Sequence, residues 1–287
     1  MQVIDAHCHF WRLSRGDYGW LSGEGGPLAP IRRDFLPADY PQDHDRDYPA
    51  ATRLIVVQAA PTLAETDFLL ALASRQPRIA GVVGWVDLSA PEAARDLRHR
   101  AANPHFKGVR PMLQDIADTD WLARRARPDA LAALRDLGLR LDALVTARHL
   151  PMLAGFARQH DDLPLVIDHA AKPQPGLPGD WAAGMQALAA IPHVHCKLSG
   201  LLTEFSAGDL RDPLPALREI LARLLDWFGA DRLIWGSDWP VLTLAAPYGE
   251  WRGLTDALLA GLAPGERAAI LRRNAARFYG IAGEVSS

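Results

Sequence analysis

Eight short segments rich in β-branched and aliphatic residues recur along the chain, and each is followed by enough sequence for one helix. Strand and helix signals that alternate in this way predict a parallel sheet, and eight of them favour a (β/α)8 TIM-like barrel. An open, doubly wound sheet is the alternative, although no Gly-rich phosphate-binding motif follows the first segment. The expected strands are 3–5, 54–58, 79–86, 106–110, 140–145, 165–169, 195–199 and 233–237.

Helical periodicity fills most of the intervals between the expected strands. The expected helices are 63–75, 90–101, 129–137, 150–160, 181–191, 214–228 and 264–279. The segment from Trp11 to about Ala51 is too long for a simple loop, and its aromatic residues favour an ordered flap over the barrel mouth. A polar connection is expected at 113–127. With 287 residues, of which 49% are hydrophobic, residues 1–287 are expected to form a single barrel domain.

Charge, apolar runs and cysteine content restrict which partners and which location are expected. A formal net charge of −3 gives no support for a nucleic acid or an anionic membrane as partner. No stretch of eighteen apolar residues occurs and the first residues do not resemble a signal peptide, so a cytoplasmic protein is expected. The two cysteines, Cys8 and Cys196, are expected to be buried thiols rather than a disulfide. The oligomeric state is left open.

The first expected strand leads into two histidines, His7 and His9, separated by Cys8. Side chains at i and i+2 of an extended segment point to the same side, so the two imidazoles are expected to converge. Two such imidazoles provide half of a zinc site, which commonly gains a carboxylate and a water from elsewhere. Asp238, which follows the last apolar segment, is the natural carboxylate for binding a metal, for taking a proton from water, or for both.

Other polar side chains stand at the ends of the expected strands. In a barrel these ends form one mouth, where an unpaired buried charge would be costly. His169 ends the sixth strand and is a candidate third imidazole, whereas Asp168 is expected to point away from it. Arg110 ends the fourth strand and could hold a substrate oxygen with its planar guanidinium, or form a structural ion pair with Asp87 or Asp142.

Seven short motifs place these candidate residues among characteristic neighbours. They are DAHCHFWR at 5–12, RGDYGWL at 15–21, FKGVRP at 106–111, DHAAKP at 168–173, KLSG at 197–200, WGSDWP at 235–240 and NAARFY at 274–279. In order and position these motifs resemble the amidohydrolase superfamily, and more narrowly its amidohydrolase-2 branch of sugar-lactone hydrolases. The resemblance implies a distorted (β/α)8 barrel. It also implies active-site positions for His7, His9, His169 and Asp238.

The resemblance leaves the metal content open. The expected strand 140–145 lacks the histidine that metal-rich members of the superfamily carry there. Lys107 stands at the start of its strand rather than at the end, so a bridging lysine and a binuclear centre are not expected. One divalent ion, most simply Zn²⁺, held by His7, His9 and Asp238, is expected, and a metal-free site is the alternative.

The resemblance implies a hydrolase that opens a sugar lactone, a small-molecule ester, by attack of water. Asp238 is the expected general base, and His169 and Arg110 are the other expected catalytic residues. A metal-dependent decarboxylase of a cyclic carboxylic acid and a non-catalytic carbohydrate-binding barrel are the alternatives. Aromatic faces and polar groups near the mouth suit a sugar ring with its hydroxyls. The expected substrate-binding residues are Tyr18, Trp239, Trp85, Gln58 and Lys172.

Overall fold

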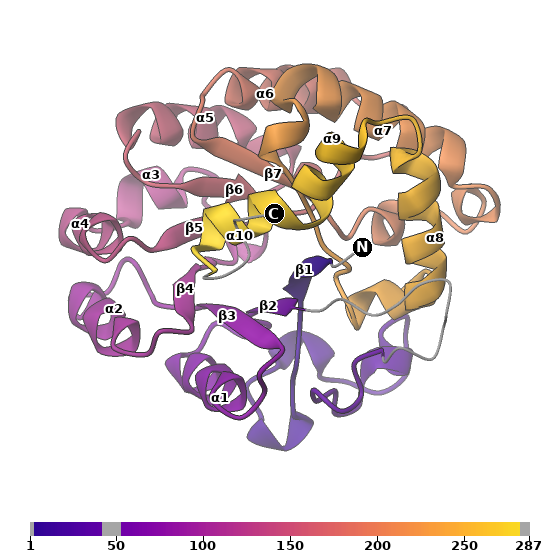
Figure 1. The fold of residues 1–287 in the computed structure, drawn as a ribbon. Coiled ribbons are helices and arrows are strands. Elements are labelled where there is room, and N and C mark those ends of the chain that lie inside the picture. Colours follow the sequence, from indigo (N-terminus) through magenta and orange to yellow (C-terminus); the bar gives the residue numbers. More distant parts are fainter. Residues whose placement is uncertain (1–2, 42–52, 282–287) are drawn as a thin grey trace.

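The computed structural model describes residues 3–41 and 53–281. Its eight strands form one parallel sheet in which each strand pairs with the next along the chain (Figure 1). This order confirms the predicted (β/α)8 barrel, because a doubly wound sheet would not follow the order of the sequence. The strands are β1 (Ile4–Cys8), β2 (Arg53–Val57), β3 (Ile79–Gly84), β4 (Phe106–Val109), β5 (Arg140–Ala143), β6 (Leu165–Ile167), β7 (Val194–Leu198) and β8 (Leu233–Trp235).

The barrel closes between its first and last strands through a few isolated hydrogen bonds rather than through a regular ladder of strand pairing. β8 has only three residues, and the chain beyond it pairs with β1 through a bridge between Cys8 and Trp239. The backbone N–H of His9 donates to the Trp239 carbonyl, and that of Asp238 donates to the His7 carbonyl, both at 2.7 Å. This irregular closure distorts the barrel and places the ends of the first and last strands side by side.

Helices surround the sheet, and most of them lie where the periodicity predicts them (Figure 1). They are α1 (Leu63–Ala73), α2 (Ala93–Ala101), α3 (Trp121–Arg125), α4 (Pro128–Asp136), α5 (Leu150–Gln159), α6 (Gly179–Ala189), α7 (Leu214–Phe228), α8 (Tyr248–Leu259), α9 (Pro264–Ala268) and α10 (Asn274–Tyr279). α3 and α8 were not expected from the sequence. Gly249 and Gly253 weaken the helical signal of α8, but its buried Tyr248 and Trp251 pack against the core. The expected last helix is divided by a π turn, Ala269–Arg273.

The C-terminal helix α10 closes one end of the barrel and lies across the centre of the ring of strands in Figure 1. The Phe278 carbonyl accepts a hydrogen bond from Arg140, which begins β5, so this is the end at which the strands start. Phe278 and Tyr279 pack against aliphatic side chains in the barrel interior. These side chains are Ile4, Ala6, Ile55, Val57, Val83, Val166 and Ile234. The opposite end, where the strands finish, is left for the mouth.

The segment that follows β1 is folded against the barrel as far as residue 41. It contains three 3-10 turns, and its Trp11, Tyr18 and Phe35 are buried. The indole N–H of Trp20 donates to the Ala59 carbonyl at 2.7 Å, which ties this segment to the end of β2. Residues 42–51 of the expected flap lie outside the described residues.

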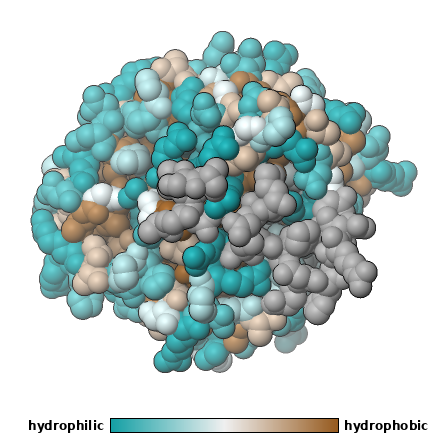
Figure 2. Space-filling view, viewed as in Figure 1, coloured by the Kyte–Doolittle hydropathy of each residue, from teal (hydrophilic) through white to brown (hydrophobic). Residues whose placement is uncertain are grey.

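Hydrophilic residues predominate on the face of the molecule shown in Figure 2. Large hydrophobic side chains are mostly buried, whereas Leu137 is 37% exposed. Cys8 and Cys196 are buried free thiols, as predicted. Within the described parts of the chain, every helix is too short or too polar to cross a membrane.

Replacing Phe278 with alanine should lower the free energy of unfolding by about 3–5 kcal/mol, because the barrel loses a buried aromatic ring at its closed end. Leu137→Ala is the control and should change it by less than about 0.5 kcal/mol, because that side chain is exposed. Urea unfolding followed by tryptophan fluorescence measures both. Equal losses in the two variants would show that α10 does not seal the barrel.

His195 should make stability depend on pH. Burial lowers the pKa of His195 to about 4, and its ring packs against Phe278. An unfolded histidine has a pKa of about 6.5, so the contribution of this group is complete above that pH and is lost as the pH falls towards 4. His195→Gln should therefore lose less unfolding free energy between pH 7 and pH 5 than the wild type in urea titrations. If both proteins lost the same unfolding free energy between pH 7 and pH 5, His195 would not be a source of the pH dependence.

Candidate active site

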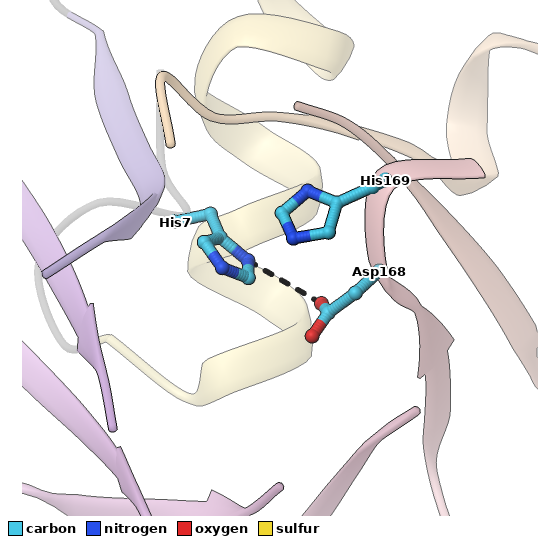
Figure 3. Close-up of side chains that lie close together, drawn as sticks. All are labelled: His7, Asp168 and His169. Carbon is cyan, nitrogen blue, oxygen red and sulfur yellow. Dashed lines mark ion pairs between the residues drawn. The ribbon is translucent and has the colours of Figure 1, made fainter. Parts of the chain in front are cut away.

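The turns at the ends of β1, β6 and β8 bring histidines and carboxylates together at the mouth of the barrel. Two overlapping groups have ligand atoms within 4.8 Å of one another: His7, His9 and Asp238, and His7, Asp168 and His169. All of these side chains are buried. Figure 3 shows the second group, with His7 turned towards Asp168 and the His169 ring beside it. The structure thus brings the three candidate imidazoles and the candidate carboxylate into one site.

The His9 imidazole is oriented by the backbone of β2. Its Nδ1 lies 2.8 Å from the Val57 carbonyl oxygen, which accepts the Nδ1–H and fixes the orientation of the ring. Nε2 in turn lies 3.2 Å from Oδ1 of Asp238. Nε2 and the carboxylate oxygen therefore need either a proton on Nε2, which the ring would donate, or a cation between them.

Asp238 lies within reach of all three imidazoles. Its Oδ1 is 3.2 Å from Nε2 of His9, 3.7 Å from Nε2 of His7 and 3.9 Å from Nε2 of His169. Burial alone would raise the pKa of Asp238, but the imidazoles of His169, His9 and His7 hold it below its ordinary value. Its φ of 62° is an uncommon backbone conformation, which aspartate tolerates better than most residues. The result is an ionised carboxylate held on a strained turn, as is common at functional sites.

The turn after β6 explains how Asp168 and His169 both reach the site. Four consecutive residues, His169 to Lys172, have φ between 49° and 58°. This left-handed turn ends the alternation of the strand, so the expectation that Asp168 points away from His169 is wrong. His169 Nδ1 lies 3.0 Å from Oγ of Ser199. A Cβ on Gly200 would lie 2.4 Å from that nitrogen, so this position requires glycine.

Arg110 reaches into the site from the end of β4. Its Nη2 donates to the Gln58 carbonyl, and the Gln58 side-chain amide donates back to the Arg110 carbonyl at 2.7 Å. Its Nη1 lies 3.4 Å from Nε2 of His7 and 3.7 Å from Oδ2 of Asp168. Its carboxylate partner is therefore Asp168 rather than either of the aspartates considered from the sequence.

A pocket of about 200 Å³ opens over these groups. The candidate residues in its wall are His9, Arg110, His169, Lys172 and Asp238. The wall also contains residues that were not selected from the sequence, namely Trp20, Ala59, Met112, Gln114, Asp115, Leu144, Thr203 and Val241. His7 is fully buried and lies outside this wall. Trp20 could have been found, since it is an aromatic residue of the expected flap, but the other residues carry no distinctive sequence signal.

Three of the expected substrate-binding residues lie behind the pocket wall. Trp239 is buried and packs edge-on against Phe35 and Tyr40. Tyr18 is buried in the same core cluster. Gln58 is fully buried and supports Arg110 as described above. Apolar packing against the flap has drawn the two aromatic rings into the core, so the structure does not bring these three side chains into the pocket.

Trp85 lines a larger neighbouring groove of about 600 Å³. Trp20, Asp87, Asp115 and Trp121 are also in its wall. Trp20 and Asp115 belong to both walls, so the two spaces adjoin. Trp85 therefore stands near the pocket but not in it.

Lys197 of β7 was not selected as a site residue, although it lies directly below His7. Its Nζ is 2.6 Å from Oδ2 of Asp142, 3.0 Å from Oδ1 of Asp168 and 3.1 Å from Nδ1 of His7. Burial alone would lower the pKa of Lys197, but the two carboxylates raise it above its ordinary value. The sequence did contain a signal for this pair, because Lys197 and Asp142 both stand within apolar strands. Charged side chains are rarely buried there without partners.

The donor set at the mouth fits one divalent ion. Nε2 of His9 lies 3.2 Å from an ionised carboxylate oxygen of Asp238, and at that distance the two atoms need a proton or a cation between them. Asp168 Oδ1 lies 3.4 Å from His7 Nδ1, an arrangement that orients metal-binding histidines. Two imidazoles and a carboxylate are a common ligand set for Zn²⁺.

Comparison with known proteins places the chain among related sequences along nearly its full length. A family model described as amidohydrolase matches residues 4–281. An L-fucono-1,5-lactonase from Burkholderia ambifaria is 45% identical, with 97% of this chain and 95% of that protein covered. An L-fucono-1,5-lactonase from Burkholderia multivorans is 40% identical, with 97% and 96% covered. A crystal structure of an amidohydrolase from Burkholderia multivorans with bound zinc has a TM-score of 0.85 and 38% identity, with 98% and 100% covered.

Replacing His9 with glutamine should weaken Zn²⁺ binding at least about tenfold, because Nε2 of His9 is the ligand atom nearest to Asp238. His195→Gln removes a histidine from β7 outside the site and should leave the affinity unchanged. Competition with a chromophoric chelator measures both constants. Equal zinc affinities in the two variants would remove His9 from the ligand set.

Proposed function

Because the chain belongs to the amidohydrolase family, we propose that it opens the ring ester of a sugar lactone by hydrolysis. The family match confirms the resemblance predicted from the motifs. One observation supports the proposal most directly, namely that an ionised carboxylate, two imidazoles and a guanidinium share the wall of one small pocket. The two relatives named L-fucono-1,5-lactonase support an aldonolactone as the substrate class.

Asp238 would act as the general base. Its pKa is held below its ordinary value by the surrounding imidazoles despite burial, so the carboxylate is ionised and can accept a proton. As the proton leaves a water in the pocket, the water oxygen bonds to the lactone carbonyl carbon. The carbonyl π electrons then move to the carbonyl oxygen, which becomes an oxyanion.

Arg110 and His169 would stabilise this oxyanion. The Arg110 guanidinium is held by Gln58 and lies in the pocket wall, where water-excluded surroundings strengthen its attraction for negative charge. Burial lowers the pKa of His169 to about 4, so its imidazole is neutral at neutral pH and can act as a hydrogen-bond partner rather than as a fixed charge.

Collapse of the tetrahedral intermediate would break the bond between the carbonyl carbon and the ring oxygen. The ring oxygen leaves as an alkoxide and takes the proton from Asp238, which returns to its ionised form. The product is the open-chain hydroxy acid, and one water is consumed. Lactone and water are thus the only reactants that the proposed reaction requires.

His7, His9 and Asp238 are the residues that would hold one divalent ion, with Zn²⁺ as the best match to the ligand types. A bound ion would supply Lewis acidity to the carbonyl oxygen and would lower the pKa of a bound water. Asp238 has two carboxylate oxygens, so a ligand bond through one of them leaves the other to exchange the proton. The related crystal structure with bound zinc supports this expectation.

Lys172 and Trp20 would contact the sugar itself. Lys172 is in the pocket wall, where its ammonium pairs with Glu204 at 3.3 Å and can also donate to a substrate hydroxyl. The indole of Trp20 offers an apolar face to the sugar ring. The other expected contacts would act from behind the wall or from the adjoining groove: Tyr18, Gln58, Trp239 and Trp85.

The two alternatives considered from the sequence receive less support. A decarboxylase receives less support because the relatives that are 45% and 40% identical are both named as lactonases. A protein that only binds sugar would gain nothing from Asp238 held among three imidazoles.

Replacing Asp238 with asparagine should lower kcat for aldonolactone hydrolysis by about 10²–10⁴-fold, because the general base is lost while the shape of the side chain is kept. Asp226→Asn, on the exposed face of α7, is the matched control and should hydrolyse lactones at the wild-type rate. A pH-indicator assay over a panel of aldonolactones measures acid release.

Undiminished turnover in Asp238→Asn would remove this residue as the base. Carbon dioxide release from cyclic carboxylic acids, without acid release from any lactone, would instead identify a decarboxylase. Lactone binding without either reaction would identify a binding protein.

A further inference from the structure

Three half-buried tryptophans gather in the groove beside the active-site pocket. The chain has nine tryptophans, of which five are buried and four, Trp20, Trp85, Trp121 and Trp227, are half-buried. The first three of these four line the groove of about 600 Å³, whereas Trp227 lies on α7. Apolar rings that stay partly open to water gain free energy when a ligand covers them, and such patches commonly mark binding sites. The concentration of three indoles in one groove therefore indicates a ligand.

The three indoles come from separate parts of the chain, and two of them are anchored by hydrogen bonds. Trp20 lies in the flap, and its indole N–H donates to the Ala59 carbonyl at 2.7 Å. Trp85 follows β3, and its backbone N–H donates to Oγ1 of Thr66 at 2.8 Å. The Thr66 hydroxyl donates back to the Trp85 carbonyl at 3.1 Å. Trp121 begins α3. The groove is thus formed before any ligand binds, as is usual for sites that take small molecules.

The polar groups of the groove suit an uncharged ligand that carries hydroxyls. Its wall contains the carboxylates of Asp17, Asp87 and Asp115 and, among the described residues, no lysine, arginine or histidine, which disfavours an anion. Asp17 is paired with Arg15 at 2.8 Å, which lowers the attraction of the wall for a cation. Oδ1 of Asp87 accepts from the N–H and the hydroxyl of Ser89. In the described part of the chain, Oδ2 of Asp87 and the Asp115 carboxylate are left as acceptors for a ligand.

The groove is continuous with the pocket in which the lactone would bind. Trp20, Met112 and Asp115 belong to both walls, so one ligand can extend from the pocket into the groove. A lactone beside Asp238 would occupy the pocket of about 200 Å³. The larger groove would then receive whatever group the lactone carries.

We propose that the groove is a second sugar-binding subsite, which holds a glycosyl residue attached to the lactone. The proposal rests on the proposed lactone hydrolysis and extends its substrate class to the lactones formed when the reducing end of a disaccharide is oxidised. The indoles of Trp85 and Trp121 pack against the C–H groups of the glycosyl ring, and Asp87 and Asp115 accept hydrogen bonds from its hydroxyls. Water attacks the same lactone carbonyl and the same ring C–O bond breaks, while the glycosidic bond stays intact.

Paired lactones test whether the groove serves the substrate. β-Galactosyl-L-fucono-1,5-lactone is compared with L-fucono-1,5-lactone, and cellobiono- and lactobiono-1,5-lactone are compared with D-glucono-1,5-lactone, in the pH-indicator assay. At least one glycosylated lactone should have a kcat/KM at least about fivefold above that of its own parent lactone, because contacts with the groove are added. If no glycosylated lactone exceeds its parent, the proposal is overturned.

Trp121→Ala, with Trp227→Ala as the matched control, tests which surface produces the preference. Both rings are half-buried and pack against the core, but Trp227 lies beside Trp181 and outside the groove. The ratio of kcat/KM for the glycosylated lactone to that for its parent should fall at least about fivefold in Trp121→Ala and stay within about twofold of the wild-type ratio in Trp227→Ala. Equal ratios in the two variants would contradict the proposal.

Asp115→Ala keeps the proposal testable if Trp121→Ala does not fold. The Asp115 side chain is exposed, so its removal should not affect folding. The same ratio should fall about two- to threefold, because the glycosyl hydroxyls lose an acceptor. A wild-type ratio in this variant would then overturn the proposal.

Methyl glycosides test the groove without any lactone. Nuclear magnetic resonance of ¹⁵N-labelled protein records the indole N–H signals of the nine tryptophans, and the variants Trp85→Phe, Trp121→Phe and Trp227→Phe assign three of them. Methyl β-galactoside or methyl β-glucoside at about 10 mM should shift the Trp85 and Trp121 signals and leave the Trp227 signal in place.

The glycoside titration separates failure of this proposal from failure of the proposed function. Lactone hydrolysis by a protein whose Trp85 and Trp121 signals move with neither glycoside would overturn the subsite and leave the proposed function standing. Shifts caused by tetramethylammonium chloride but by neither glycoside would identify a cation site and would overturn the subsite as well. Glycoside-induced shifts in a protein that hydrolyses no lactone would instead count against the proposed function.

Discussion

Two backbone hydrogen bonds between the end of β1 and the turn after β8 hold the site together. They join His9 to Trp239 and Asp238 to His7, at the place where the sheet would otherwise stay open. His9 and Asp238 are 229 residues apart in the sequence, yet their side chains approach to 3.2 Å because the barrel closes there. β8 is only three residues long, so these two bonds help to fix the last strand against the first, together with the backbone N–H of Ser237, which donates to Oδ1 of Asp5 at 2.8 Å.

The barrel interior contains an apolar part and a group of buried polar side chains. Aliphatic side chains and the rings of α10 seal the end at which the strands start. Among the buried polar side chains, Lys197 lies between the carboxylates of Asp142 and Asp168. Burial and the nearby ammonium lower the pKa of His7 well below its ordinary value, whereas the imidazoles hold the pKa of Asp238 down despite its burial. The site therefore combines a neutral imidazole with an ionised carboxylate.

Aromatic residues of the flap show why residue type alone is a weak guide to a binding site. Trp20 and Tyr18 stand two positions apart in the sequence, but Trp20 lines the pocket and Tyr18 is buried in the core. A large aromatic ring is equally suited to packing in a core and to contacting a sugar. Whether Tyr18 or Trp20 faces the pocket depends on the path of the chain through the 3-10 turn Gly19–Leu21. Sequence periodicity does not describe such a turn.

The sequence by itself determined the alternation of strands and helices, the barrel, the family, and the pairing of His7 and His9 with a distant aspartate. The barrel and the convergence of His7 and His9 follow from periodicity and from the side-chain directions of extended segments, which are local properties. The family follows from the resemblance of short motifs. Only the tertiary structure decided that Asp168 faces the site, because that depends on a left-handed turn of non-glycine residues. It also decided that Lys197 lies beneath His7, since a buried charge finds its partners only when distant strands are brought together.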